Sequence, residues 1–128
     1  MSSLNSPSSN VLSAKSTIFL LLITIAPHSM AGGFSEGAIP TRIDIDRERG
    51  LMVYGNFGNP AGCTISDRVY INYTHPQYQQ IYSAVLAAYA SGKRIQVYAH
   101  TCKPVGWYSV DSVTYNHVES YGTVSLFN

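Results

Sequence analysis

Apolar positions recur at helical spacing between residues 76 and 92. The stripe consists of Tyr78, Ile81, Tyr82, Val85, Leu86 and Tyr89. A proline at position 76 suits the first turn of a helix, where its missing N–H would be unpaired in any case, so Thr74 or His75 is the predicted N-cap. Gly92 is predicted to end the helix in the left-handed conformation. This pattern therefore predicts one amphipathic helix.

After the helix the apolar period shortens to two residues, which is typical of a β-strand. In the predicted strand 94–100, Ile95, Val97 and Ala99 face one side and the more polar residues face the other. Similar alternation predicts further strands at 39–46, 51–57, 68–73, 107–118 and 121–127. It places Leu51, Val53 and Phe57 on the core face of the second of these strands, and Val69, Ile71 and Tyr73 together on one face of the third. The alternation slips within the long extended stretch, so a bulge or sharp bend is expected there.

The order of these elements is three strands, one helix and two or three further strands, which is the order of an OB-fold. We therefore predict a mainly β domain with one helix (α+β), arranged β-β-β-α-β-β as a small OB-fold-like antiparallel barrel. A charged turn at residues 47–50 would join the first two strands as a hairpin, with Gly50 free to adopt a positive φ. An open antiparallel sheet with the helix packed across it is the alternative.

Residues 1–31 have the pattern of a signal peptide. Lys15 precedes an uncharged apolar run at 17–26, and small residues at 29 and 31 occupy the positions that define a cleavage site. As a helix the run would span about 15 Å, half of a bilayer core, so no membrane span is expected after signal removal. We therefore predict a signal peptide, 1–31, and an exported domain, 32–128, which is periplasmic or secreted. A buried N-terminal helix is the alternative for the first segment.

Charge is sparse and balanced in the predicted exported domain. The whole chain has 8 Lys/Arg and 7 Asp/Glu, and Lys15 lies in the predicted signal, so residues 32–128 have no net charge with His neutral. This balance disfavours nucleic acid and anionic lipid as partners. All 10 tyrosines lie in this domain. A surface poor in charge and rich in tyrosine favours an interface, although core packing is the simpler explanation for any single tyrosine.

The chain has two cysteines, Cys63 and Cys102. In an exported protein the expected state is a disulfide, and this one would close a loop of about 40 residues, worth about 4 kcal/mol on the chain-entropy model. Two isolated cysteines lack the further ligands that zinc requires, and His75, His100 and His117 lack the short spacing of helical metal sites. We therefore expect neither a metal nor a cofactor.

Groupings typical of enzymes are sparse. Asp44 and Asp46 share one strand face, with Cα atoms about 7 Å apart, but the arginines that follow them favour a solvated charged edge that discourages strand association. Ser66, beside Asp67, lacks the Gly-x-Ser-x-Gly elbow of hydrolases. We therefore predict that the protein is not an enzyme, with a small secreted hydrolase as the least favoured alternative.

Aromatic and amide side chains coincide on the strand faces opposite the predicted core. The predicted ligand-binding residues are Tyr54, Asn56, Tyr70, Asn72, Gln96 and Tyr98, with Trp107 and Tyr108 as a rim. Rings stack on the C–H faces of sugars while amides and hydroxyls bond sugar hydroxyl groups, so this surface favours glycan binding. Contact with another subunit, or burial beneath a loop, is the alternative.

The central part of the chain resembles two groups of known proteins. The loop 58–63, the helix 82–92 and the strand that ends at Cys102 look like uncharacterised small exported proteobacterial proteins. More distantly, the chain resembles the binding subunits of the subtilase-cytotoxin and typhoid-toxin type at Tyr82, Tyr89, Gly92, Ile95, Val97, Tyr98 and Trp107. Those subunits are OB-fold proteins that form pentameric rings and bind cell-surface glycans, often sialylated.

This resemblance implies a toxin B subunit-like module that binds a glycan and forms a homo-oligomer. The helix face opposite the apolar stripe is small and uncharged, which suits close contact between subunits: Gln80, Ser83, Ala84, Ala87 and Ala90. We therefore predict a non-enzymatic secreted recognition module whose partner is a cell-surface glycan or a protein. A periplasmic structural or inhibitor-like protein-binding domain is the alternative.

Overall fold

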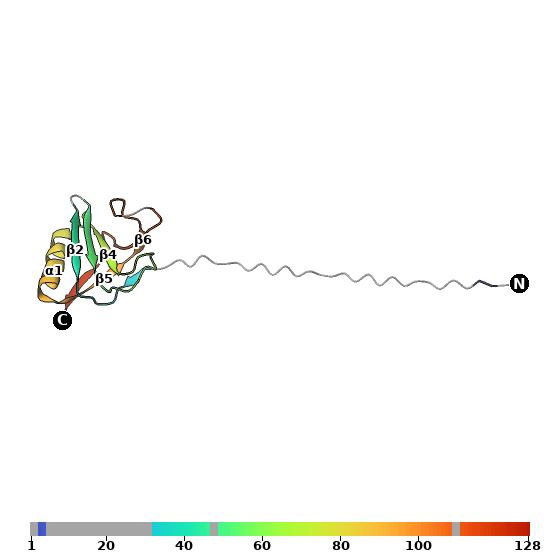
Figure 1. The fold of residues 1–128 in the computed structure, drawn as a ribbon, viewed down its shortest axis with the longest axis horizontal. Coiled ribbons are helices and arrows are strands. Elements are labelled where there is room, and N and C mark those ends of the chain that lie inside the picture. Colours follow the sequence, from blue (N-terminus) through green and yellow to red (C-terminus); the bar gives the residue numbers. More distant parts are fainter. Residues whose placement is uncertain (1–2, 5–31, 47–48, 109–110) are drawn as a thin grey trace.

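The computed structural model describes residues 3–4, 32–46, 49–108 and 111–128, and it shows a mainly β domain with one helix (Figure 1). In chain order the elements are β1 (Gly33–Phe34), β2 (Arg42–Asp46), β3 (Gly50–Tyr54), β4 (Arg68–Asn72), α1 (Tyr78–Ser91), β5 (Arg94–Ala99), β6 (Thr101–Lys103), β7 (Tyr115–Val118) and β8 (Val124–Phe127). The predicted α+β class is confirmed. The predicted signal peptide lies outside the described residues, apart from residues 3–4.

The described strands form two open sheets, so the prediction of a closed antiparallel barrel is wrong. One sheet has the order β2-β3-β4-β7-β6 and the other has the order β1-β5-β8. The β4–β7 pair is parallel, whereas the other strand pairs are antiparallel. A parallel pair needs a long crossover connection, and here α1, β5 and β6 lie between the two strands in the chain. The chain passes from one sheet to the other at His100, between β5 and β6.

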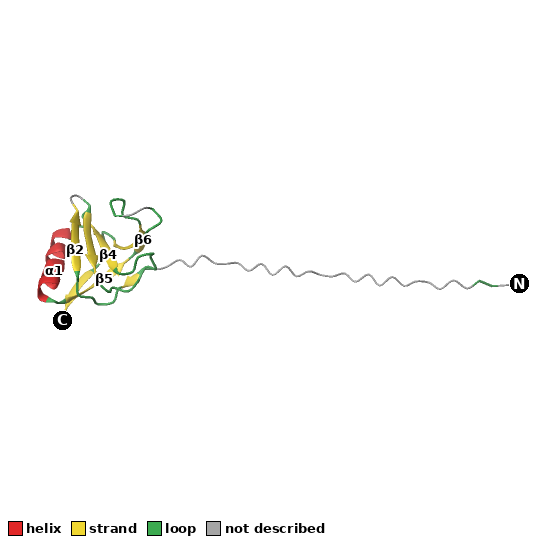
Figure 2. Ribbon diagram, in the orientation of Figure 1, coloured by secondary structure: helices red, strands yellow, loops and turns green. Residues whose placement is uncertain are grey.

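The main core lies between α1 and the inward faces of both sheets (Figure 2). Most of the residues predicted to face inward on the strands are fully buried: Leu51, Val53, Val69, Ile71, Ile95, Val97 and Ala99. Tyr73 is an exception, because it lies beyond the end of β4 and is 49% exposed. Helix α1 contributes Ile81, Val85 and Ala88 to the same core. The predicted stripe is wrong at its end, because Leu86 and Tyr89 are 37% and 52% exposed and Ala88 takes the inward position instead. Among the described residues, no helix combines the length and apolar character needed to cross a membrane.

The end of the helix was predicted correctly and its start was not. Gly92 caps α1 with φ of 66°, and its N–H donates to the Ala88 carbonyl. At the other end the N-cap is Gln77, without a side-chain capping bond, so the predicted N-cap at Thr74 or His75 is wrong. His75 instead belongs to the preceding turn, where its Nδ1 accepts the Gln77 N–H at 3.0 Å while its Nε2 bonds the Gly122 carbonyl at 3.0 Å.

The predicted disulfide between Cys63 and Cys102 is confirmed. The two Cα atoms are 5.2 Å apart, and the bond joins the loop before β4 to β6 across a sequence separation of 39 residues. The loop is also held by two side-chain amides, of which Asn116 is fully buried and Asn59 is exposed. Asn59 bonds both the N–H and the carbonyl of Cys63 at 2.7 Å, and Asn116 of β7 accepts the Ala61 N–H at 3.0 Å.

The predicted extended stretch 107–118 is a strand only at its end, in β7. Most of the preceding residues form a loop that covers the outer face of β3 and β4. The bend expected near Asp111 and Ser112 coincides with a turn at these two residues, next to residues 109–110, which lie outside the described residues. A second core cluster lies beneath this loop and is built around Met52, Tyr70, Val105 and Tyr115. The predicted outward-facing side of β3 and β4 is therefore largely buried, with Met52 0% and Tyr70 5% exposed.

Candidate functional site

The structure divides the predicted ligand-binding residues between three places. Tyr70, Asn72 and Trp107 line one pocket on the five-stranded sheet. Tyr54 lies in the same apolar cluster as Trp107 without lining the pocket, Gln96 and Tyr98 belong to β5 in the other sheet, and Asn56 is exposed in the loop after β3. The predicted single surface across three strands is therefore replaced by one pocket and one separate aromatic row.

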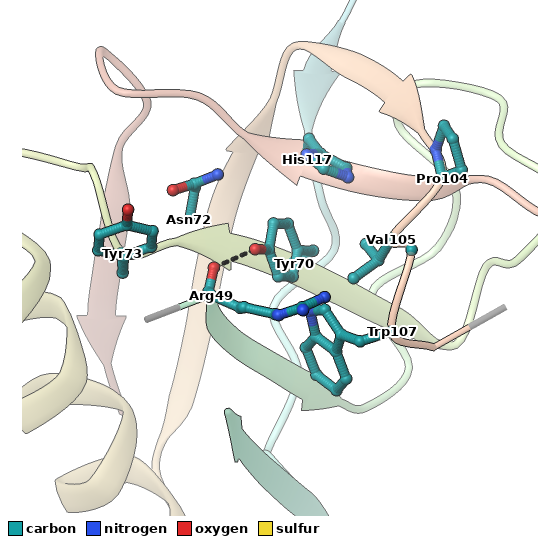
Figure 3. Close-up of a pocket in the computed structure, with 9 residues that line it drawn as sticks. Arg49, Tyr70, Asn72, Tyr73, Pro104, Val105, Trp107 and His117 are labelled. Atoms are coloured by element: carbon teal, nitrogen blue, oxygen red, sulfur yellow. Dashed lines mark hydrogen bonds between the residues drawn. The ribbon is translucent and has the colours of Figure 1, made fainter. Parts of the chain in front are cut away.

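The pocket is a polar and aromatic hollow of about 340 Å³ (Figure 3). Its walls come from the β2–β3 turn, the end of β4, the loop after β6, and β7. They are Arg49, Tyr70, Asn72, Tyr73, Pro104, Val105, Gly106, Trp107 and His117. These segments meet because β4 pairs with β7 and the loop after β6 folds back over β3 and β4. The pocket is thus a product of long-range strand pairing.

Tyr70 forms the central wall of the pocket. Its hydroxyl donates a hydrogen bond to the Arg49 carbonyl, and its ring centroid lies 4.6 Å from that of His117 (Figure 3). Burial raises the pKa of the Tyr70 hydroxyl, and the nearby indole of Trp107 partly opposes this effect. The ring is therefore fixed in place and uncharged at neutral pH, as a stacking surface requires.

His117 of β7 is 7% exposed, and its Nε2 atom has no hydrogen-bond partner among the described residues. Burial lowers the pKa of His117 to about 4, against the opposing effects of Glu119 and of a hydrogen bond to the Lys103 backbone. Because Nε2 has no partner, that backbone bond is assigned to Nδ1. A neutral imidazole that donates from Nδ1 carries a lone pair on Nε2, so Nε2 is an acceptor.

Trp107 supplies a hydrogen-bond donor to complement the acceptor nitrogen of His117. Its Nε1–H is buried and has no partner within hydrogen-bond geometry in the described structure, although it lies close enough to the Tyr70 hydroxyl to affect its pKa. Its ring packs edge-on against Tyr108, with centroids 4.4 Å apart. The pocket therefore contains one buried donor and one buried acceptor that the described residues do not satisfy.

The rim of the pocket is formed by three residues that are more exposed than Tyr70 and His117, namely Arg49, Asn72 and Tyr73. The Asn72 side-chain oxygen accepts two hydrogen bonds from Thr74, at 2.9 and 2.8 Å. The amide N–H groups of Asn72 therefore point away from Thr74 (Figure 3). The Arg49 guanidinium lies 3.6 Å from the Asp46 carboxylate and is largely solvated. Tyr73, which was predicted to face the core, lies just beyond β4 and is 49% exposed.

Tyr54 lies among charged groups. The guanidinium groups of Arg42 and Arg68 lie over its ring, 4.7 and 4.3 Å from the centroid. Its hydroxyl bonds the Asp44 carboxylate at 3.1 Å and also contacts the Tyr108 hydroxyl. Burial and the Asp44 hydrogen bond together raise the pKa of Tyr54. The ring is thus occupied by neighbouring side chains, and a ligand arriving here would meet guanidinium groups first.

The carboxylates considered for catalysis each have an arginine partner. Asp44 pairs with Arg42 at 2.7 Å, and Asp46 pairs with Arg49 at 3.6 Å. In the part of the chain that the structure describes, no group of three His, Cys, Asp or Glu side chains could hold a metal ion.

Gln96 and Tyr98 hold the N-terminal segment of the domain. The Gln96 amide donates to the Ser35 carbonyl at 2.8 Å, and the Tyr98 hydroxyl donates to the Gly32 carbonyl at 3.1 Å. Tyr98 also belongs to a row of aromatic rings in which successive centroids lie 4.9, 4.6 and 4.3 Å apart: Phe34, Tyr98, His100 and Tyr121. None of these four residues lines the pocket, although the backbone N–H of His100 donates to the carbonyl of the pocket residue His117 at 2.9 Å.

Sequence reasoning missed several residues of the pocket, namely Arg49, Tyr73, Pro104, Val105, Gly106 and His117. His117 was considered only as a metal ligand, and Tyr73 was assigned to the core. The one local signal was the apolar pair at 104–105, two residues after Cys102, because a disulfide fixes the start of such a loop at the sheet.

Fold and site together define a small disulfide-linked α+β domain with one aromatic and amide-lined pocket. No family model, curated protein or solved structure matches the chain. The chemistry of the pocket is therefore the basis for assigning a function.

Proposed function

We propose that this chain is an exported, non-enzymatic recognition module that binds a glycan in the pocket around Tyr70 and Trp107. The observation that supports this is the combination, in one hollow of about 340 Å³, of aromatic planes, a side-chain amide and buried polar atoms without partners. This volume lies at the small end of the range for ligand pockets and suits a single sugar ring. The disulfide is typical of the oxidising periplasmic or extracellular environment.

Sugars need such a mixed surface. Their ring faces carry C–H groups that stack on aromatic side chains, while their edges carry hydroxyl groups that both donate and accept hydrogen bonds. Tyr70, Tyr73 and Trp107 provide aromatic surface in the pocket, and Asn72 provides amide donors at its rim. No charged group is buried in the pocket, since Arg49 is solvated at its edge.

An OB-like arrangement remains part of the proposal. The strand order β2-β3-β4-β7-β6, with β4 and β7 parallel, and the passage of the chain between sheets at His100 are consistent with an OB-type barrel that is split open. By the resemblance to toxin binding subunits, we further propose a homo-oligomer. Sedimentation of the purified protein tests this, because a monomer at high concentration would contradict it.

A matched pair of tyrosines tests the glycan site. Tyr73 lines the pocket and is 49% exposed, while Tyr89 on the outer face of α1 is 52% exposed. We expect Tyr73→Ala to lose binding on a glycan array and Tyr89→Ala to retain it, because only Tyr73 can stack on a pocket ligand. Both variants should unfold within about 0.5 kcal/mol of the unmodified protein, as exposed substitutions usually do. Absence of any bound glycan, or equal losses for both variants, would contradict the proposal.

A periplasmic structural or inhibitor-like protein-binding domain is the second candidate. It is favoured by the aromatic row on the other sheet, whose end members Phe34 and Tyr121 are largely exposed. Aromatic side chains are enriched at protein interfaces. If this candidate is correct, Phe34→Ala should abolish capture of the partner protein and Tyr73→Ala should not.

A further inference from the structure

The floor of the pocket contains two polar atoms whose hydrogen-bonding capacity is unused within the described structure. They are Nε2 of His117 and Nε1 of Trp107, and both are buried from solvent. In folded proteins roughly nine in ten buried polar groups have a partner, so each exception requires an explanation. The His117 ring is more than nine-tenths buried, which makes an unused nitrogen there especially unfavourable.

These two atoms flank the same aromatic side chain. Figure 3 shows His117 on one side of Tyr70 and Trp107 on the other, with the Tyr70 hydroxyl directed to the Arg49 carbonyl. The Tyr70 hydroxyl proton is therefore already used and is not available to His117. A ligand that enters beside Tyr70 is the group best placed to reach the two unused atoms.

The two atoms have opposite hydrogen-bonding roles. Trp107 can only donate, and Nε2 of His117 can only accept while Nδ1 donates to the Lys103 backbone. A hydroxyl group both donates and accepts, so it can satisfy either atom. A carboxylate only accepts, and placing it against the Nε2 lone pair would bury an unpaired negative charge. The Arg49 guanidinium also lines the pocket and acts on the Tyr70 hydroxyl, but it is about half exposed and lies 3.6 Å from the Asp46 carboxylate, so it offsets this cost only in part.

From this arrangement we infer that the pocket selects an uncharged, hydroxyl-bearing sugar ring, with His117 and Trp107 as the residues that determine this specificity. The inference rests on the proposed glycan binding and adds the chemical class of the ligand. Any acidic part of a larger glycan would then lie outside the floor, near Arg49.

The chain contains a single tryptophan, which makes the test direct because Trp107 fluorescence reports on the pocket alone. The probes are the methyl glycosides of glucose and galactose, each compared with the corresponding glucuronide and galacturonide. Within a pair the sugars differ only in the replacement of a CH₂OH group by a carboxylate. We expect at least one neutral glycoside to change the fluorescence at pH 7, with its acidic counterpart binding at least about tenfold more weakly.

Two histidine variants complete the test. His117→Phe keeps an aromatic ring and removes the acceptor, whereas His117→Gln restores an acceptor oxygen. His100→Phe is the matched control, because His100 also has a buried ring nitrogen without a described partner but belongs to the aromatic row. We expect His117→Phe to weaken binding of the neutral glycoside about tenfold, His117→Gln to recover part of it, and His100→Phe to leave it unchanged.

The outcomes separate this inference from the proposed function. Preferential binding of the acidic sugars, or unchanged binding by His117→Phe, would overturn the inference and leave glycan binding intact. If the phenylalanine variant fails to fold, the comparison of neutral and acidic sugars on the unmodified protein still decides the question. If no glycoside binds and the glycan array is also blank, the proposed function and the inference both fail.

Discussion

Single side chains decide which parts of the pocket a ligand can reach. Alternation along the strands correctly placed Leu51, Val53 and Ile71 in the core, because neighbouring side chains of a strand point to opposite faces. The same alternation placed Met52 and Tyr70 on an open face, and they are buried by the loop after β6. Alternation shows which residues share a face, but whether that face is covered depends on residues distant in the chain.

The buried imidazole of His117 should make stability depend on pH. Its pKa is lowered to about 4 by burial, whereas in the unfolded chain it returns to about 6.5. Between these values the unfolded state binds the proton and the folded state does not, so stability is complete above pH 6.5 and is lost as the pH falls towards 4. We expect urea unfolding to show a loss of about 2 kcal/mol between pH 7 and pH 5.

His117→Phe should remove this dependence, and the control His100→Phe should retain it. The charged groups that act on His117 are Glu119 and Lys103. Burial raises the pKa of Glu119, but hydrogen bonds from Lys103 and Thr101 outweigh it and the net shift is downward. Glu119 therefore adds acid sensitivity only at still lower pH. An equal slope in both variants would contradict the assignment.

The hydrophobic periodicity predicts some secondary-structure elements of this chain better than others. Strand β5 follows its predicted period, helix α1 follows it as far as Val85, and Gly92 ends the helix as expected. The stretch 107–118 was predicted as one extended strand with a bulge or bend, on the basis of its alternating residues. Alternation describes fit to a half-buried pleated surface, and because, of its described residues, only 115–118 pair with other strands, most of the segment serves as a covering loop. Its aromatic residues are buried against β3 and β4 instead.

Replacing two glycines at the ends of elements with alanine should lower the unfolding free energy by different amounts. Gly92 has φ of 66°, and a Cβ added there meets no heavy atom within 4 Å, so Gly92→Ala should cost only the backbone strain of about 1 kcal/mol. Gly50 has φ of 139°, and its added Cβ would lie 2.1 Å from the Ile71 carbonyl oxygen. Gly50→Ala should therefore cost several-fold more, because β3 and β4 must separate. Urea unfolding of both variants measures the difference, and equal losses would contradict it.

For the whole molecule, the disulfide and the β4–β7 pair bring distant parts of the chain together. Cys63 lies in the loop before β4, and Cys102 lies within β6, from which the covering loop departs. The disulfide therefore fixes the strand at the start of the covering loop, while the loop itself is held on the sheet by apolar contact. We infer that the pocket depends on the disulfide more strongly than the main core does.

Removal of the disulfide tests this dependence. On the chain-entropy model the double variant Cys63→Ala/Cys102→Ala should lose about 4 kcal/mol of unfolding free energy. In conditions where the variant stays folded, the Trp107 fluorescence should shift towards that of a solvated indole, because the loop is no longer held at β6. The far-ultraviolet signal of α1 should change little. A variant that unfolds in one step with unchanged tryptophan fluorescence before the transition would show that apolar contact alone holds the loop.

The amino-acid sequence was sufficient for the features that depend on neighbouring residues or on simple chemistry. These are the helix and its glycine end, the strand faces of the main core, and the pairing of the only two cysteines. The helix end follows from backbone sterics at glycine, the helix and the strand faces follow from apolar periodicity, and the disulfide follows from the absence of any other cysteine. The residues predicted for the ligand came partly together, since Tyr70, Asn72 and Trp107 share a pocket while Gln96 and Tyr98 do not.

The pocket itself depends on contacts between residues about 50 positions apart, such as Tyr70 with His117 and Tyr54 with Tyr108. No local period predicts that β4 pairs in parallel with β7, or that a loop closes over an apparently open sheet face. These outcomes follow from the competition of all apolar surfaces for burial in one small domain. For that reason His117, an unremarkable polar residue in the sequence, became a buried acceptor only when the chain was folded.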